Sequence, residues 1–471
     1  MDIDMAKLKL RGKELLALGY PEGKVIGVAI NMMLKYYKRS KKSEVLDLLT
    51  QVLQAPERYE DHEFLGKIAA ELLEPDEELK QEIPLLQETL EFPTFGLDQI
   101  EEGALQQMQI AMRLPVTKAG ALMPDAHQGY GLPIGGVLAV ENAVIPYGVG
   151  MDIGCRMCLT VYDLKPAFLE KNRSQLSDML MENSRFGRGV FDRPFDDEVL
   201  THTAFREIPK VKELRHKAIA QIGSSGSGNH FVEFGRVDIT DPENEMGLTP
   251  GSYLGILTHS GSRGFGAGIA RHYTKIAMEK CLLPKEARHL AWLSLDSEAG
   301  QEYWIAMNLA GDYASACHHH IHRRLGTALG AEPLAMVENH HNFAWKETLS
   351  DGREMIVHRK GATPAGKGVL GVIPGSMTAP GFIVRGKGSA LSLNSASHGA
   401  GRLMSRRKAK ERISKHQLKK HLRDLGVDLL GGGLDEAPFA YKDIHQVMQH
   451  QEKLVDVLGT FLPKVVRMDA G

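Results

Sequence analysis

Long apolar runs and cysteines are scarce in this chain of 471 residues. The chain has no run of about 18 apolar residues, which is the length needed to span a bilayer. Its first residues lack the basic segment and apolar core of a secretion signal. Four cysteines are too few for a disulfide scaffold in a chain of this length, and free thiols are typical of a reducing compartment. These absences predict a cytoplasmic protein with no membrane contact.

The chain also lacks a strong net charge, since its formal net charge is −2. A value this small excludes no class of binding partner. Residues 1–85 differ from the rest because they are rich in Leu, Lys and Glu, and residues 45–53 have the spacing of an amphipathic helix. The acidic stretch 74–78 has the composition of a linker. We therefore predict a small, mainly helical N-terminal domain over residues 1–85, a candidate for binding RNA or a partner.

Residues 86–471 have a different texture, with apolar β-type runs at 136–140, 157–162 and 254–258 alternating with glycine turns. Strands and helices follow one another without a regular β-α-β rhythm, which favours an α+β fold over a doubly wound sheet. The sequence predicts one large catalytic domain of mixed sheets and helices. Helical stretches are expected near residues 198–222, 265–281, 297–328, 402–425 and 441–458.

What this region has in abundance is glycine: the chain carries 49, many of them beside residues that bind metals. A carboxylate, a thiolate and several imidazoles form a set suited to a divalent ion such as Zn²⁺, Mn²⁺ or Fe²⁺. They are far apart in sequence, so only a folded core could gather them, as in an enzyme active site. The candidate ligands are Asp152, Cys155, His230, His259 and His341.

Each of these residues also has a plainer interpretation. A lone buried cysteine is more often core than ligand, and Cys155 with Cys158 matches the spacing of a redox pair, although no second pair or thioredoxin-like context accompanies it. We assign Cys158 to the core of a strand. The run 318–320 holds three histidines inside an expected helix, where neighbouring residues face different directions, so we expect surface or core positions for them.

Other motifs suit phosphate. The Gly/Ser loop 223–228 can present backbone N–H groups to an anion, and the Arg263 guanidinium suits bidentate phosphate binding, although either could be a plain surface loop. Cations and hydroxyls recur at 358–363, 374–377 and 398–402. Ten Lys or Arg residues against one Glu lie between Arg402 and Arg423, which predicts contact with a nucleic-acid backbone unless they form a merely solvated face.

Taken together, the motifs of residues 90–471 resemble those of the RNA-splicing ligase RtcB family. Each motif alone is weakly specific, whereas all of them in the family's order are highly specific. They are Pro124-Asp125-Ala126-His127-Gln128-Gly129-Tyr130-Gly131-Leu132-Pro133-Ile134-Gly135, Gly150-Met151-Asp152-Ile153-Gly154-Cys155, Gly228-Asn229-His230-Phe231, His259-Ser260-Gly261-Ser262-Arg263-Gly264, His341-Asn342, His358-Arg359-Lys360-Gly361-Ala362-Thr363 and His398-Gly399-Ala400-Gly401-Arg402.

The resemblance implies an RtcB-like catalytic domain that joins an RNA 3′-phosphate or 2′,3′-cyclic phosphate end to a 5′-hydroxyl end, in tRNA splicing or RNA repair. It implies GTP and two Mn²⁺ ions as cofactors, RNA as substrate and an archease-like activator protein as a further partner. The reaction would pass through a GMP–histidine adduct and an RNA end activated as RNA–ppG.

The same resemblance implies a role for individual residues. His398 would be the nucleophile, and the five candidate ligands would hold the metals, with Cys155 shared between two ions. Asp125 and His127 would orient ligands. The residues expected to contact the nucleotide are Asn229, Ser376, His398, Gly399, Ala400, Gly401 and Tyr441, and those expected to contact phosphate are Arg263, Lys360 and Arg402.

Two departures from the family pattern stand out. Arg156 replaces the small residue that usually follows the metal-binding cysteine, which would add a cation beside the metals. Ala470 occupies the position of a C-terminal Lys that helps to recognise guanine in the family. The preference of this chain for GTP over ATP is therefore left open. Two other hypotheses remain: a non-catalytic protein that binds RNA ends, and a metal-dependent phosphodiesterase that opens cyclic phosphates without ligation.

Overall fold

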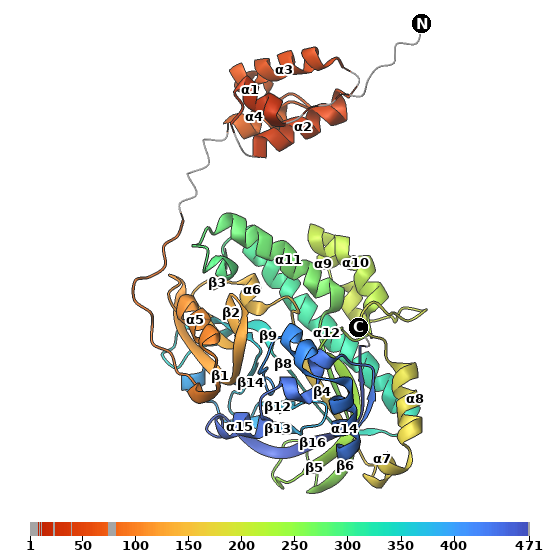
Figure 1. Ribbon diagram of the computed structural model, residues 1–471. Coiled ribbons are helices and arrows are strands. Elements are labelled where there is room, and N and C mark those ends of the chain that lie inside the picture. Colours follow the sequence, from red (N-terminus) through yellow and green to blue (C-terminus); the bar gives the residue numbers. More distant parts are fainter. Residues whose placement is uncertain are drawn as a thin grey trace. The chain divides into compact units, whose positions relative to one another are not determined.

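The computed structural model describes residues 8, 10, 12–21, 24–38, 40–73 and 82–469. Contacts divide the chain into two compact units, Met1–Gln81 and Glu82–Gly471 (Figure 1). The linker expected at 74–78 and the departure at Ala470 lie outside the described residues. Each unit has its own core, so each is described by itself.

The N-terminal unit is helical. Its core forms because apolar residues recur every three or four positions, as Val45, Leu49 and Val52 do along one helix. The Tyr20 hydroxyl donates a 2.8 Å hydrogen bond to the Leu49 carbonyl, which connects the segment after the first helix to the helix of Leu49. The helices are α1 (Gly12–Leu18), α2 (Lys24–Tyr36), α3 (Lys42–Gln54) and α4 (Gly66–Leu73), with the 3₁₀ turn η1 (Pro56–Tyr59).

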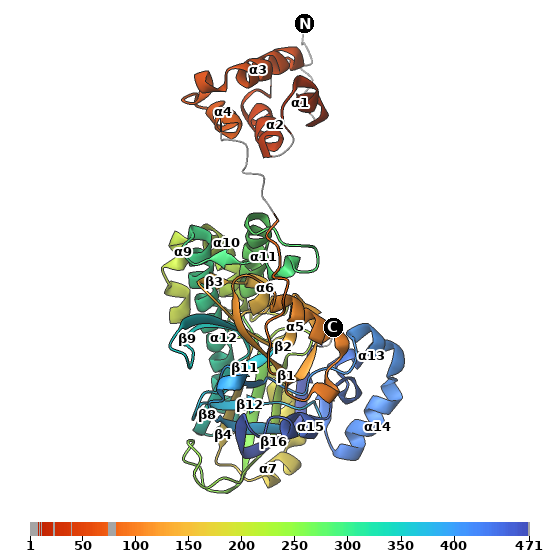
Figure 2. The ribbon, with the colours of Figure 1, turned by 90° about the vertical axis from the view of Figure 1, so that its left-hand side faces the viewer.

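The C-terminal unit mixes helices and sheets, which confirms the predicted α+β class. Helices α9, α10 and α11 lie together at one end of it in both views (Figures 1 and 2). The helices are α5 (Glu102–Ala111), α6 (Pro146–Val149), α7 (Ala167–Lys171), α8 (Arg173–Asn183), α9 (Ala204–Glu207), α10 (Pro209–Gln221), α11 (Arg263–Lys280), α12 (Glu298–Leu329), α13 (Arg406–Arg412), α14 (Lys415–Leu425) and α15 (Ile444–Gln449).

The larger sheet has the strand order β12-β13-β16-β5-β6-β4-β8, with β15 added in parallel to β16. Its other neighbouring strands run antiparallel. The strands are β4 (Arg156–Tyr162), β5 (Phe231–Ile239), β6 (Gly251–Ser260), β8 (Pro333–His340), β12 (Leu370–Ile373), β13 (Gly381–Gly386), β15 (Asp428–Leu430) and β16 (Val455–Met468).

A second sheet has the order β1-β2-β10-β9, and two short ribbons pair β3 with β7 and β11 with β14. The second sheet carries the motif from Pro124 to Tyr130 and places Lys360 at the end of a strand. The strands are β1 (Thr117–Tyr130), β2 (Leu132–Val140), β3 (Ala143–Val144), β7 (Leu293–Ser294), β9 (Asn342–Thr348), β10 (Glu354–Lys360), β11 (Ala362–Pro364) and β14 (Ser395–Ser397).

The two faces of the larger sheet have different roles. Successive residues of a strand point to opposite faces, so Thr258 and His259 on β6 are directed to different sides. The face of Thr258 is covered by α12, whose Ile321 and Leu325 pack with Val232 and Ile256. The face of His259 borders a cavity. The same strands therefore support both a packed core and an open site.

Three helix predictions need correction. The expected helix 402–425 is two helices, because Ser414 caps α14 in a capping box with Gln417 and interrupts the helical run. The stretch 441–458 holds only α15, since β16 begins at Val455 and pairs on both sides. The stretch 198–222 becomes η3 (Glu198–Thr201), α9 and α10, with Pro209 at the start of α10.

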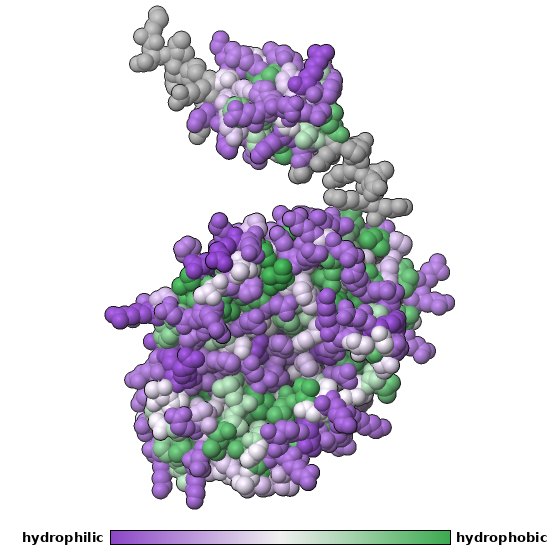
Figure 3. All heavy atoms as spheres, turned by 180° about the vertical axis from the view of Figure 1, so that it is seen from behind, coloured by the Kyte–Doolittle hydropathy of each residue, from purple (hydrophilic) through white to green (hydrophobic). Residues whose placement is uncertain are grey.

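The surface of the described part of the chain is mostly hydrophilic on the face seen from behind, where apolar side chains gather only in smaller areas (Figure 3). None of the helices that the structure describes is long and apolar enough to cross a membrane.

Candidate active site

Three predicted metal ligands converge between β4, β5 and β6. The Cys155 sulfur lies 3.4 Å from His230 Nε2 and 3.2 Å from His259 Nε2, and all three side chains are buried. They are drawn from a span of 104 residues, and the antiparallel pairing of β4, β5 and β6 brings them together. This is a preformed group of one thiol and two imidazoles.

The two other predicted ligands adjoin this group. Asp152 Oδ2 lies 2.9 Å from His230 Nε2, and His341 Nε2 lies 3.2 Å from His259 Nε2. The five candidate ligands therefore form one continuous cluster. The structure brings together all the residues that the sequence predicted as ligands.

The donor atoms of this cluster fit a divalent cation. His259 Nδ1 lies 3.0 Å from the Asn229 carbonyl, which accepts a hydrogen bond, so the Nε2 lone pair is directed at Cys155 and His341. Burial and the neighbouring His230 lower the pKa of His259 to about 3, and burial with nearby imidazoles lowers the pKa of His341. Neutral nitrogens facing one another at this distance repel unless a proton or a cation lies between them.

Two glycines are required by the close packing around the cluster. A Cβ on Gly226 would lie 1.7 Å from His230 Nδ1, and a Cβ on Gly261 would lie 2.2 Å from Asp152 Oδ1. Any larger residue would displace the ligand side chain. The Gly-flanked motifs of the sequence thus reflect the space that the candidate ligands occupy.

His398 lies beside this cluster, with its ring centroid 4.9 Å from that of His341. Its Nδ1 donates a 2.6 Å hydrogen bond to Asp125 Oδ2, and its backbone N–H donates to the same oxygen at 3.2 Å. Burial acts to raise the pKa of Asp125, but His398 and Lys442 outweigh it and hold this pKa below its usual value. The carboxylate thus fixes the imidazole through Nδ1 and leaves the Nε2 lone pair free for reaction.

A cavity opens beside His398, and His259 of the ligand cluster also lines it. Every residue that the sequence assigned to nucleotide contact lines it, although these residues come from four separate parts of the chain. They are Asn229, Ser376, His398, Gly399, Ala400, Gly401 and Tyr441. The mixture of glycine backbone, hydroxyl and aromatic groups suits a nucleotide.

Glu233 is a cavity residue that the sequence reasoning missed. It is 3% exposed and lines the cavity with Leu257 and Val466, its partners on the neighbouring strands. Burial raises the pKa of Glu233 well above its usual value. The signal was strand alternation after the Asn229-His230 motif, which puts residue 233 on the same face as residue 231.

Of the three predicted phosphate-binding cations, Arg402 lines the cavity. It donates to the Asp435 carbonyl at 2.7 Å and lies 3.4 Å from both Glu436 and the Tyr441 hydroxyl. Glu436 also accepts from Tyr441 and Arg406. Beyond Arg406, the basic helices α13 and α14 expose Lys408, Arg412, Lys415, Lys419 and Arg423.

The other two cations lie outside the cavity lining. Arg263 is buried and donates to Ser224 and the Gly187 carbonyl, and its φ of 58° is a left-handed conformation that costs a non-glycine residue about 1–3 kcal/mol. Lys360 is buried as well and donates to the Tyr130 carbonyl at 2.6 Å. Burial lowers the pKa of Lys360 to about 7.

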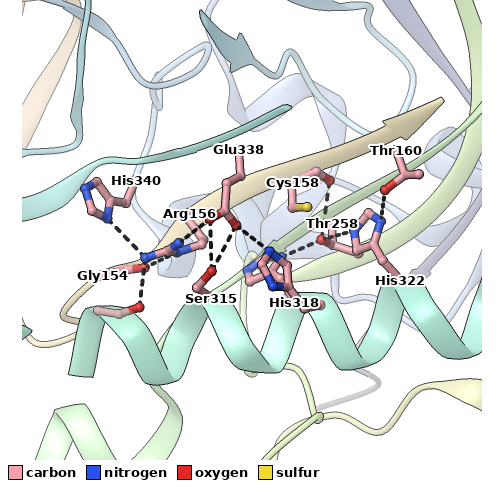
Figure 4. A network of polar contacts seen from close by, with 12 residues as sticks. Gly154, Arg156, Cys158, Thr160, Thr258, Ser315, His318, His322, Glu338 and His340 are labelled. Atoms are coloured by element: carbon pink, nitrogen blue, oxygen red, sulfur yellow. Dashed lines mark hydrogen bonds and ion pairs between the residues drawn. The ribbon is translucent and has the colours of Figure 1, made fainter. Parts of the chain in front are cut away.

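Arg156 is not directed at the candidate metal ligands, contrary to the prediction of an added cation there. Its guanidinium donates to the Gly311 carbonyl at 2.8 Å and to Glu338 at 3.0 Å, on the side of α12 (Figure 4). The reason is strand alternation, which turns residue 156 away from the face of Cys155. The guanidinium also lies 3.3 Å from the Gly154 carbonyl and so braces the turn that precedes Cys155.

A second group of a cysteine and two histidines lies on the α12 side of the sheet: Cys158, His318 and His322 (Figure 4). Cys158 is buried within β4, as the sequence predicted. His318 and His322 are fully enclosed, and both contact the Thr258 hydroxyl. Exposed His319 lies 3.5 Å from Glu338.

Comparison with known proteins gives consistent results. The profile of the family described as tRNA-splicing ligase RtcB matches residues 106–211 and 191–469. The RNA-splicing ligase RtcB of Escherichia coli K12 is 34% identical over 394 residues, covering 77% of this chain and 93% of that protein. The RNA-splicing ligase RtcB of Mycobacterium tuberculosis is 31% identical, covering 76% and 99%, and the tRNA-splicing ligase RtcB of Thermococcus kodakarensis is 29% identical, covering 82% and 97%.

Proposed function

The chain belongs to the tRNA-splicing ligase RtcB family, and we propose on this premise that it is a GTP- and Mn²⁺-dependent RNA ligase. It joins an RNA 3′-phosphate or 2′,3′-cyclic phosphate end to a 5′-hydroxyl end, in tRNA splicing or RNA repair. An archease-like activator protein is part of the same proposal. The observation that carries it is the position of His398, which lines the cavity proposed for the nucleotide and lies beside the cluster of candidate metal ligands.

The first step is the guanylylation of His398. Its Nδ1–H is held by Asp125, so Nε2 attacks the α-phosphorus of GTP. A P–N bond forms, the bond between the α-phosphorus and the bridging oxygen breaks, and pyrophosphate leaves. The buried carboxylate stabilises the positive charge that develops on the imidazole, as an orienting carboxylate does for a catalytic histidine.

Asp152, Cys155, His230, His259 and His341 would hold the Mn²⁺ ions. Bound Mn²⁺ supplies positive charge that offsets the charge of the triphosphate. The side chains contribute neutral imidazole nitrogens, since burial lowers the pKa of His259 to about 3.

The later steps transfer the GMP. A cyclic end is first opened by water to a 3′-phosphate. An oxygen of the 3′-phosphate then attacks the guanylyl phosphorus, the P–N bond breaks, and the RNA end becomes RNA–ppG. The 5′-hydroxyl finally attacks the RNA phosphate, loses its proton and releases GMP. Arg402 lines the nucleotide cavity and suits the guanylyl phosphate, and Arg263 and Lys360 are the cations proposed for the RNA phosphate.

Glu233 is the group we propose to select guanine. An ionised carboxylate accepts two hydrogen bonds, and the guanine edge offers two donors, N1–H and N2–H, whereas adenine offers one donor beside an acceptor. The apolar surroundings of Glu233 make an unpaired carboxylate unfavourable there. The same surroundings strengthen the hydrogen bonds that the carboxylate forms with guanine. Selection of GTP over ATP then depends on a residue of the described cavity.

The test is incubation with α-labelled GTP and Mn²⁺ followed by a denaturing gel. The wild type becomes labelled, His398→Ala does not, and the matched control His416→Ala, an exposed histidine on α14, is labelled like the wild type. An unlabelled wild type would refute the proposal. RNA binding without label would then favour the non-catalytic protein, and opening of cyclic phosphate without GTP would favour the phosphodiesterase.

A further inference from the structure

An aromatic cluster that takes no part in the proposed nucleotide chemistry lies at the end of the Pro124–Tyr130 motif. The Tyr130 ring centroid lies 6.5 Å from that of Tyr147 and 6.1 Å from that of His289, both edge-on, and Tyr147 stacks on His289 at 5.0 Å. Tyr130 is 68% exposed. An aromatic ring supported by two others and open to solvent is a surface on which a nucleobase can stack.

A groove of about 630 Å³ begins at Tyr147 and runs along α11. Arg271, Lys275 and Arg288 line it together with a single carboxylate, Glu279. Glu279 lies 3.7 Å from Lys275. In the part of the chain that the structure describes, neither Arg271 nor Arg288 has a carboxylate partner. Both are exposed, so the groove presents two free guanidinium groups.

The groove adjoins the candidate active site without overlapping the nucleotide cavity. Met151, which lines the groove, directly precedes Asp152. Lys360 donates to the Tyr130 carbonyl, and its Nζ lies 4.9 Å from the Tyr147 ring centroid. The next residue, Gly361, is so close to His398 that a Cβ there would lie 3.2 Å from the imidazole Cε1. The groove and the cavity share no lining residue, so both can be filled at once.

We propose that Tyr130, Tyr147, Arg271 and Arg288 bind the single-stranded end of the RNA substrate. Tyr130 stacks on a nucleobase close to the reacting end, and the two guanidinium groups hold phosphates further along the strand. Arg suits this role because its planar fork binds phosphate in a bidentate manner. An aromatic platform is useless to a duplex whose bases are already stacked, so the occupant is an unpaired strand. This inference rests on the proposed ligase function.

The test measures the binding of a fluorescently labelled single-stranded RNA with a 3′-phosphate by anisotropy at several salt concentrations, together with the KM for this RNA in joining. Tyr130→Ala is expected to weaken binding about tenfold, within the range known for loss of one stacked base. Tyr130→Phe keeps the ring and should stay within about twofold of the wild type. This rescue distinguishes stacking from a general loss of structure.

A double variant, Arg271→Glu with Arg288→Glu, tests the phosphate contacts. It is expected to reduce the slope of log affinity against log salt by about 0.7 for each lost contact. The matched control is Lys280→Glu with Lys285→Glu, two exposed cations outside the groove, for which we expect a smaller change in the slope.

The outcomes separate the two proposals. A wild type that forms no GMP adduct and joins no RNA refutes the ligase function itself. A wild type that joins RNA, with Tyr130→Ala and the double arginine variant binding the strand as tightly as the wild type, overturns the groove proposal alone. Equal binding of a blunt duplex and of the single strand would also overturn it.

Discussion

The two faces of β4 and β6 carry two similar groups of cysteine and histidine that differ in how their polar atoms are paired. On the cavity side, Cys155, His230 and His259 approach one another directly. On the α12 side, Cys158 lies with His318 and His322. Cys158 is a residue of β4, and Cys155 lies three positions earlier, directly before that strand. Burial lowers the pKa of His259 to about 3 and that of His322 to about 3, so the charge state does not distinguish the groups.

Hydrogen bonding does distinguish them. The Ser260 carbonyl can only accept, so His318 carries its proton on Nε2, 3.2 Å away, and its Nδ1 accepts from the Thr258 hydroxyl at 2.5 Å. His322 Nε2 must then donate to Thr258 at 2.8 Å, and its Nδ1 accepts from Thr160 at 2.7 Å. Every imidazole nitrogen of this pair has an oxygen partner.

On the cavity side, His259 Nε2 and His341 Nε2 face each other at 3.2 Å, and neither nitrogen has an oxygen partner within the part of the chain that the structure describes. Buried polar groups are normally paired, so the first group needs a further binding partner and the second does not. Proximity of cysteine and histidine is therefore a poor indicator of a metal site unless the lone pairs are free. We infer that only the cavity-side group binds metal.

The largest expected effect comes from replacing each of the two cysteines, Cys155 and Cys158, by serine in separate variants. Cys155→Ser should weaken Mn²⁺ binding by at least about 100-fold, since even the loss of a residue that merely supports a ligand costs 10- to 100-fold. Cys158→Ser, the matched control three residues further along the chain, should keep the metal content of the wild type. Titration calorimetry and metal analysis measure both. Equal loss in the two variants would contradict the distinction.

The next effect concerns the carboxylates of the two faces. Glu338 on the α12 side is paired with Arg156 and Ser315, whereas no described residue forms such a pair with Glu233, for which burial alone shifts the pKa. Glu233→Gln presents one donor and one acceptor, which matches adenine better than guanine. We expect the ratio of labelling by GTP to labelling by ATP to fall about 10- to 100-fold. An unchanged ratio would remove Glu233 from base selection.

A smaller effect is expected from Thr258→Val, which removes the hydroxyl shared by His318 and His322. Each buried nitrogen left unpaired costs about 1–3 kcal/mol of the free energy of unfolding. Urea denaturation measures it. Thr274→Val is the control, because the buried Thr274 hydroxyl has no hydrogen-bond partner among the described residues and its loss should cost little. Comparable destabilisation by the two variants would contradict the paired network.

The smallest effect is a pH dependence of GTP affinity. Burial raises the pKa of Glu233, so the carboxyl is protonated between its usual pKa and the raised one. Guanine requires the ionised form, so binding releases a proton and affinity increases with pH in that interval, by at most tenfold per pH unit. Calorimetry in buffers of different ionisation enthalpy measures the proton release. Burial acts to raise the pKa of Glu338, but His319 and Arg156 outweigh it and hold this pKa low. Glu338 should therefore not contribute to the pH dependence of GTP affinity.

Much of the candidate site was readable from the sequence because its motifs are local. Gly226 and Gly261 stand where a Cβ would collide with His230 and Asp152, so the spacing of glycine and ligand is fixed within each motif. Glu233 was missed because a single carboxylate in an apolar strand has no motif of its own. The direction of Arg156 was predicted wrongly because the residue was judged by its neighbour Cys155 and not by strand alternation.

Residue identity and spacing determined which side chains could bind metal and nucleotide, and they indicated the family and the α+β class. Local sequence carries this information because each ligand needs its own small neighbours. Only the tertiary structure decided which Cys–His group has free lone pairs, that Asp125 holds His398 through Nδ1, and that a groove with Tyr130 lies beside the site. These depend on strands and helices remote in sequence, whose pairing fixes the direction of every side chain.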